Sequence, residues 1–64
     1  MNKAELYVAS GNQGTKLITK SFATPWERDH WVVNVLDYGY RETGPKGSIY
    51  WPKWAIWKVT TWEE

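Results

Sequence analysis

The sequence predicts an α+β fold, a two-layer sandwich in which one helix covers one face of a small antiparallel sheet. Three observations predict it. Two strand-like stretches lie near the N-terminus, a clear helix start follows them, and a further strand-like region ends the chain. The predicted order is β-β-α-β in a single domain spanning residues 1–64. The sequence is also compatible with an extra short strand after the helix.

The first two strands are predicted to form a hairpin. Leu6 and Val8 alternate with polar or small neighbours in the segment Ala4–Ser10, which is the period of a half-buried strand. The segment Thr15–Phe22 is rich in β-branched residues, which favour strands. Between them, Gly11–Gly14 reads GNQG and predicts a four-residue turn.

A helix is predicted from Pro25 to about Tyr38. Thr24 is suited to cap the helix, Pro25 fits its first position, and Glu27 completes a capping box. Gly39 is expected to end the helix in a left-handed conformation. Since this helix crosses over the sheet, the last strand can pair antiparallel to the first, which gives the strand order 2-1-3.

The helix has an unusually wide apolar surface. Its polar arc covers about 80° at 100° per residue, and it contains Glu27, His30, Asn34 and Asp37. Apolar side chains spread over about 220°, roughly twice what a surface helix needs. Only Arg28 and Asp29 interrupt that span, and we expect both to reach solvent from the first turn. One flank should pack on the sheet, and the other should meet the C-terminal half, a second subunit or a partner.

The C-terminal half is predicted to contain a short strand at Tyr40–Thr43, a turn at Gly44–Gly47 and further strand at Ser48–Trp62. The last segment is interpreted as one long strand or two strands joined at a bulge. Pro52 cannot donate a ladder hydrogen bond, so the strand there should be an edge or bulged. On a continuous strand both faces are apolar, one carrying Tyr50, Trp54 and Ile56, the other Trp51, Trp57 and Val59. Such a strand is either buried on both faces, or buried on one face with the other exposed as an apolar binding surface.

The composition excludes several classes of protein. The net charge of +1 is too balanced for a protein whose main task is binding duplex phosphate. Cysteine is absent, which excludes disulfides and zinc-thiolate sites. No apolar run is long enough to cross a membrane, and the N-terminus lacks an apolar signal-peptide core. We therefore expect a complete cytoplasmic protein with no membrane partner.

No catalytic or metal-binding constellation is predicted. The lone histidine, His30, lies in the polar arc of the helix and is expected to be a solvated surface residue. Asp29 and Asp37 are about 80° and two turns apart, which is poor geometry for an acid–base pair. We expect no cofactor, no metal and no enzymatic activity.

The tryptophans carry the functional prediction. Four of the six lie in Tyr50–Trp62, more indole surface than so small a core can hide. The predicted core residues are Leu6, Val8, Ile18, Phe22, Val32, Val35 and Leu36. Tryptophan and tyrosine are common interface anchors, so we expect a protein-binding surface. Its predicted residues are Tyr50, Trp51, Lys53, Trp54, Trp57 and Lys58, with Trp26 or Trp31 on the helix as a second anchor.

The leading hypothesis is a non-enzymatic module that binds another protein stoichiometrically. A short chain with few catalytic groups and many aromatic residues resembles a viral or prophage accessory protein that inhibits a host enzyme. This is an analogy to a class of proteins only. An alternative is a platform for single-stranded nucleic acid, because lysines accompany the aromatic residues and Lys16 and Lys20 should share a strand face. A homo-oligomer, such as a homodimer, is the third hypothesis, since self-association would stabilise so short a chain.

Overall fold

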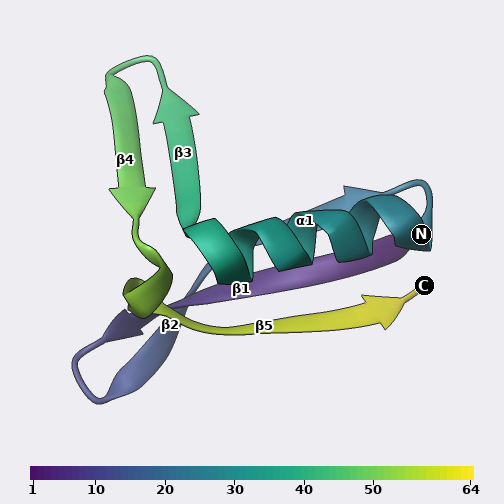
Figure 1. The fold of residues 1–64 in the computed structure, drawn as a ribbon, viewed down its shortest axis with the longest axis horizontal. Coiled ribbons are helices and arrows are strands. Elements are labelled where there is room, and N and C mark those ends of the chain that lie inside the picture. The colour runs from purple at the N-terminus through teal and green to yellow at the C-terminus, as the bar shows by residue number, and fades with distance from the viewer.

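The computed structural model describes all 64 residues and has the predicted two-layer α+β architecture. Three antiparallel strands form the main sheet in the order β2-β1-β5, where β1 spans Asn2–Ser10, β2 spans Gln13–Phe22 and β5 spans Ile56–Glu63. One helix, α1, spans Pro25–Tyr38 and lies across one face of this sheet (Figure 1). The predicted strand order 2-1-3 is therefore confirmed.

The β1–β2 hairpin is tighter than predicted, and it contains a bulge. Its turn is Gly11-Asn12, so Gly14 belongs to β2, where it pairs with Ala9. The register shifts between Leu6 and Tyr7, which leaves Leu17 of β2 as the extra residue.

The bulge separates two lysines that were predicted to share a face. Lys16 is opposite Tyr7, whereas Lys20 is opposite the buried Ala4. We call the face of the main sheet that α1 does not cover the open face. Because cross-strand partners point to the same face, Lys16 lies on the open face and Lys20 on the helix side. The prediction of a common face is wrong, because an extra residue reverses the alternation.

The predicted bounds of α1 and its capping box are confirmed, but the predicted left-handed conformation of Gly39 is wrong. The Thr24 hydroxyl accepts a hydrogen bond from the Glu27 backbone N–H at 3.2 Å, and it donates to the Glu27 carboxylate. Gly39 follows the last residue with φ +88° and ψ −170°, so φ is positive as predicted, but the backbone is not left-handed helical. Its N–H donates to the Val35 carbonyl at 2.9 Å, one of the carbonyls at the helix C-terminus that have no partner within the helix.

The core is small and is centred on β1. Its buried residues are Ala4, Leu6, Val8 and Val35. Three further predicted core residues, Ile18, Phe22 and Val32, are half-buried. The prediction for Leu36 is wrong, since its side chain is 46% exposed. One residue further along the helix turns the side chain by about 100° from Val35, away from a sheet of only three strands.

Arg28 also differs from its prediction. Its side chain is only 13% exposed instead of reaching solvent. It pairs with Asp29 at 3.0 Å and approaches Glu63 of β5 at 3.8 Å. A long aliphatic stem can cover apolar surface while its charged head finds carboxylates, which explains this placement.

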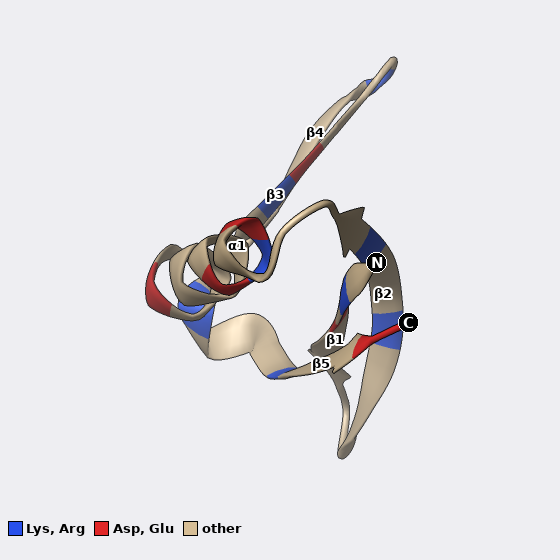
Figure 2. Cartoon of the chain, turned by 90° about the vertical axis from the view of Figure 1, so that its right-hand side faces the viewer, with Lys and Arg blue, Asp and Glu red and all other residues tan.

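A second, two-stranded sheet projects from the body as an arm (Figures 1 and 2). It consists of β3, Tyr40–Gly44, and β4, Gly47–Trp51, so the predicted extra strand is present. The prediction that Ser48–Trp62 is one strand, or two joined at a bulge, is wrong. After Pro52 the chain forms a one-turn 3-10 helix, η1, at Lys53–Ala55, and β5 then joins the other sheet. Pro52 cannot extend a ladder, and the turn that follows redirects the chain.

A chain of aromatic rings connects the arm to the body. Successive ring centroids are 5.8, 6.0 and 6.2 Å apart along the series Phe22, Trp31, Tyr40 and Trp51. The Tyr50 hydroxyl also donates to the Tyr38 carbonyl at 2.7 Å. Burial, with a smaller contribution from Glu42, raises the pKa of Tyr40. The base of the arm is therefore fixed, whereas every residue from Arg41 to Tyr50 is exposed.

Candidate protein-binding surface

The structure divides the predicted binding residues among four places. Tyr50 and Trp51 belong to the arm, Lys53 and Trp54 to η1, and Trp57 and Lys58 to β5. The two helix candidates, Trp26 and Trp31, lie on α1. The residues of η1 and the start of β5 lie together at one end of the molecule, whereas Trp26 lies in the first turn of α1 at the other end, so a single continuous surface cannot use all eight residues (Figure 1).

Trp54 is the most exposed large apolar side chain of the protein, at 84%. It lies in the middle of η1, whose turn is closed by a 2.8 Å hydrogen bond from the Ala55 N–H to the Pro52 carbonyl. The Ile56 N–H donates to the Lys53 carbonyl at the end of the same turn. Because Pro52 also restricts its own φ, the indole is presented by a constrained segment.

A β-bulge places Trp57 on the open face of the main sheet. The register of β5 against β1 shifts between Tyr7 and Val8, which leaves Trp57 as the extra residue. Its ring covers Gly14, where a Cβ atom would lie only 1.3 Å from Cε3 of the indole. Gly14 is thus a glycine because the ring occupies the space of a side chain. The bulge lets Trp57 and its neighbour Lys58 lie on the same face.

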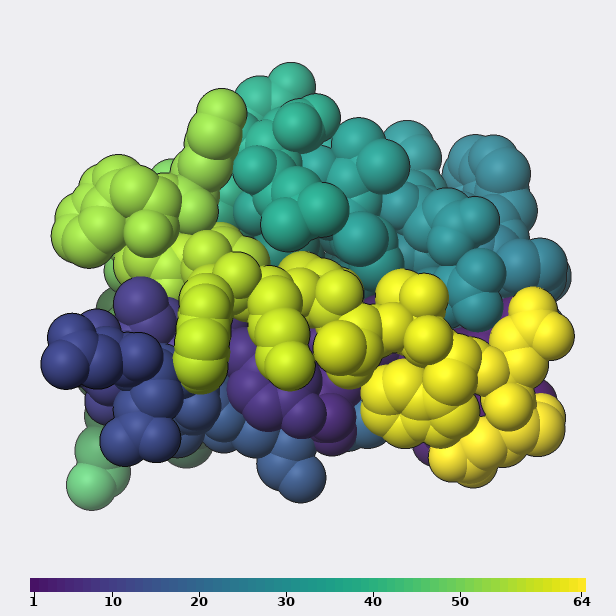
Figure 3. Space-filling model, turned by 90° about the horizontal axis from the view of Figure 1, so that it is seen from below, coloured from purple at the N-terminus to yellow at the C-terminus, as the bar shows by residue number.

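A small hollow of about 150 Å³ lies beside Trp57. Its lining consists of Trp57 and residues of the β1–β2 turn, namely Ala9, Gly11, Asn12 and Gln13. We call Lys53, Trp54, Trp57 and the Gly11-Asn12 turn the tryptophan end. Figure 1 shows η1 and this turn at the end of the molecule away from both termini, and Figure 3 shows their surfaces close together.

The remaining tryptophan candidates differ in exposure. Trp26 is 71% exposed, and its ring stacks on that of His30 with centroids 5.2 Å apart. It lies in the first turn of α1, at the end opposite the tryptophan end (Figure 1). Trp31 and Trp51 are half-buried members of the aromatic chain that fixes the arm. Their contacts indicate that both stabilise the fold.

The open face of the main sheet has a tyrosine at its centre. Tyr7 of β1 pairs with Lys16 on one side and Lys58 on the other, and the Lys58 ammonium lies 4.9 Å from its ring centroid. The Tyr7 hydroxyl donates to Glu5 at 2.7 Å, and this hydrogen bond is the main reason why the pKa of Tyr7 is raised. Thr19 donates to the same carboxylate at 2.6 Å. The Thr19 hydrogen bond, followed by that of Tyr7, lowers the pKa of Glu5.

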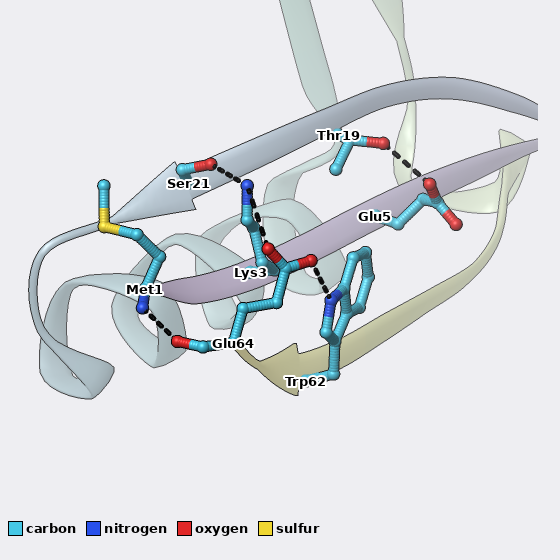
Figure 4. A network of polar contacts seen from close by, with 7 residues as sticks. All are labelled: Met1, Lys3, Glu5, Thr19, Ser21, Trp62 and Glu64. Atoms are coloured by element: carbon cyan, nitrogen blue, oxygen red, sulfur yellow. Dashed lines mark hydrogen bonds and ion pairs between the residues drawn. The ribbon is translucent and has the colours of Figure 1, made fainter.

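The rest of the open face carries charges that are mostly paired. Figure 4 shows Lys3 between the Ser21 hydroxyl, at 2.6 Å, and the Glu64 carboxylate, at 4.0 Å. Glu64 also accepts a 3.0 Å hydrogen bond from the Trp62 indole. Lys16 approaches Glu5 at 3.8 Å. Among the lysines of this face, only Lys58 has no carboxylate partner.

Tyr7, Trp62 and Ile49 were not among the residues selected from the sequence, although Ile49 is exposed and the other two are half-buried with one side toward solvent. The predicted strand order already places the first strand beside the last, so it could have identified Tyr7 as a neighbour of Lys58. Ile49, 61% exposed, had no such signal. Its exposure depends on the arm standing apart from the body, which alternation alone does not reveal.

Neither helical element has the length and apolar composition needed to cross a lipid bilayer. Comparison of the chain with protein-family models, with curated proteins and with solved structures found no match. The fold and the exposed rings thus define a class, a small α+β domain with a tryptophan-bearing end.

Proposed function

We propose that this protein is a non-enzymatic module that binds another protein stoichiometrically through the tryptophan end. The observation that carries the proposal is the 84% exposure of Trp54 on a constrained turn. Because the backbone of this turn is already constrained, it loses little conformational entropy on binding, and tryptophan is enriched among residues that dominate interface energies. Lys53 and Lys58 supply a polar rim around the two indoles.

The hollow beside Trp57 supports the same surface. Trp57 is 50% exposed and forms one wall of a hollow that a partner side chain can enter. An exposed anchor beside a recess is the arrangement in which interface hot spots pair with each other. By analogy of class, the partner is a host enzyme that the protein inhibits as a viral or prophage accessory protein acting in the cytoplasm.

The test is partner capture by the wild type, Trp54→Ala, Trp57→Ala and a matched control, Trp26→Ala. Trp26 is 71% exposed but lies at the opposite end of the molecule. The first two variants should weaken binding by about 30-fold or more, the effect of losing a hot-spot residue, and the control should bind like the wild type. Partners retained by both folded variants would contradict the proposal.

A second candidate is single-stranded nucleic acid bound on the open face. The arrangement of Tyr7 between Lys16 and Lys58 favours it, because a base can stack on the ring while ammonium groups meet phosphates. Titration with labelled oligo-dT at two salt concentrations distinguishes the candidates. Binding that weakens steeply with salt and is lost in Tyr7→Ala would support this second candidate.

A further inference from the structure

The two sheets present four outer strand edges, and three of them are protected. The outer edge of β2 carries Lys16 and Lys20 with the bulge at Leu17 between them. The edge of β5 has the bulge at Trp57 together with Lys58 and Glu63. Charged residues and bulges on an edge strand discourage pairing with another chain.

The arm shows the contrast most directly, because its two strands differ. Strand β3 contains the charged residues Arg41 and Glu42, and the Arg41 guanidinium lies 5.2 Å from the centroid of the Tyr50 ring on the neighbouring strand. Strand β4 itself reads GSIYW, with no charged residue, no proline and no bulge. Ile49 is 61% and Tyr50 49% exposed on β4. Figure 1 shows β4 on the side of the arm away from α1, so its free edge faces away from the body. In Figure 2 the charge colours appear on β3 and at the tip of the arm.

We propose that β4 is a homodimerisation edge that pairs antiparallel with β4 of a second copy. A two-fold axis through Ile49 sets Ser48 opposite Tyr50 of the other copy and Gly47 opposite Trp51. No charge faces another charge in this register, and the two Ile49 side chains meet directly. The same operation on β3 would set Glu42 against Glu42 of the second copy, which is unfavourable.

The proposed pairing also gives the arm what it lacks alone. A free two-stranded hairpin is marginally stable in water, and three or more strands with an apolar face are needed for independent stability. Two paired arms form a four-stranded sheet in which Ile49 and Trp51 of both copies lie on one face, since alternate residues share a face.

The charged strands explain why the assembly stops at two copies. After β4 pairs with β4, the outermost strands of the new sheet are the two copies of β3, which carry Arg41 and Glu42. Those edges are protected against further addition. An isologous contact that uses up the unprotected edge closes the assembly, whereas a head-to-tail contact would extend it.

The first test is the mass of the full chain in solution. Sedimentation velocity from micromolar to millimolar concentration should show a monomer–dimer equilibrium with nothing larger. Hydrogen exchange of the β4 amides that point away from β3 should slow as the dimer forms. A wild type that remains monomeric throughout this range overturns the proposal, even if the arm accepts a strand from a different protein.

Matched variants locate the interface. Ile49→Lys and Ser48→Lys place like charges near the two-fold axis and should raise the dimer dissociation constant by about tenfold or more. Thr43→Lys adds the same charge to the other strand of the arm and should dimerise like the wild type. Circular dichroism checks that all three variants fold. A dimer that both β4 variants leave unchanged, or that Thr43→Lys disrupts equally, overturns the proposal.

This inference stands independently of the tryptophan end. Trp54→Ala should leave the dimer intact, because η1 follows β4 and does not belong to the paired edge. Loss of partner binding in that variant, together with an unchanged dimer, would show that the two surfaces act separately. Loss of the dimer in Trp54→Ala would overturn the assignment to β4.

Discussion

Different interactions stabilise the body of this protein and the arm. The body buries four side chains, three from β1 and one from α1, and these make up the buried core. The arm buries none, and its attachment includes one edge-on and one stacked ring contact at its base and the hydrogen bond from Tyr50 to the Tyr38 carbonyl. A small aliphatic core thus specifies the body, while aromatic contacts at one end orient the arm.

Body and arm together show how a short chain without cysteine distributes its aromatic residues. Half-buried Phe22, Trp31, Tyr40 and Trp51 extend the small core as a row of large rings. Three other indoles are exposed, those of Trp54 and Trp57 at the tryptophan end and that of Trp26 at the other end of the helix. A single protein therefore uses the same residue type for stability in one place and for a candidate interface in another.

The largest expected effect is on the body. Leu6→Ala removes the only large side chain that is fully buried, and it should lower the free energy of unfolding by about 3 kcal/mol or more. A domain of this size has a total stability of only about 5 kcal/mol, so the variant should be close to unfolded. Urea denaturation followed by circular dichroism measures the loss.

The arm provides the matched comparison for that loss. Ile49→Ala shortens a side chain that is 61% exposed and should change the free energy of unfolding by no more than about 0.5 kcal/mol. The measurement is made at a concentration where the chain is monomeric. Equal losses in the two variants would contradict the division between a packed body and an exposed arm.

A smaller effect is expected at the joint between the two regions. In Gly39→Ala, the new Cβ would lie 2.3 Å from the Trp51 carbonyl oxygen, and φ is +88°. The backbone of β4 must therefore move, and the free energy of unfolding should fall by about 2 kcal/mol. Compared with the wild type, hydrogen exchange should become faster in the arm more than in the body.

Gly11→Ala is the control for that variant. Gly11 has φ +64° but no atom within 4 Å of a new Cβ, so only the backbone penalty of about 1 kcal/mol remains. The difference between the two glycine variants isolates the steric contact at the joint. If both variants lost the same stability and the arm kept its protection, the joint would not depend on this close approach.

Local patterns in the sequence predicted most of the body. The period of two in β1 and the Thr24-Pro25-Glu27 signal identified a strand and a helix start, and the crossover of the helix gave the order 2-1-3. These features depend on residues close in sequence or on general topology, so a single chain contains enough information for them.

The arm and the faces of the strands could not be predicted in the same way. Two bulges, at Leu17 and Trp57, each reverse the alternation, and neither has a local signal because a bulge is defined against the partner strand. The segment after Pro52 was assigned to one ladder, although β4 and β5 belong to different sheets. The positions of Trp54 and Trp57 followed from these tertiary features.

The smallest expected effect is the pH dependence contributed by Glu5 on the open face. Hydrogen bonds from Thr19 and then Tyr7 lower its pKa below the ordinary 4.5, so the folded state favours the carboxylate. The stabilisation is therefore present above pH 4.5 and is lost as the pH falls through the lower folded-state pKa. Titration of the Glu5 side-chain carbon by NMR should show the lowered pKa, and Thr19→Val should move it back toward the ordinary value. The variant should also show less acid destabilisation between those two pKa values than the wild type, while the arm, which holds none of these groups, should report no change. A Glu5 pKa that is ordinary in the wild type, or unmoved in Thr19→Val, would exclude this hydrogen bond as the cause.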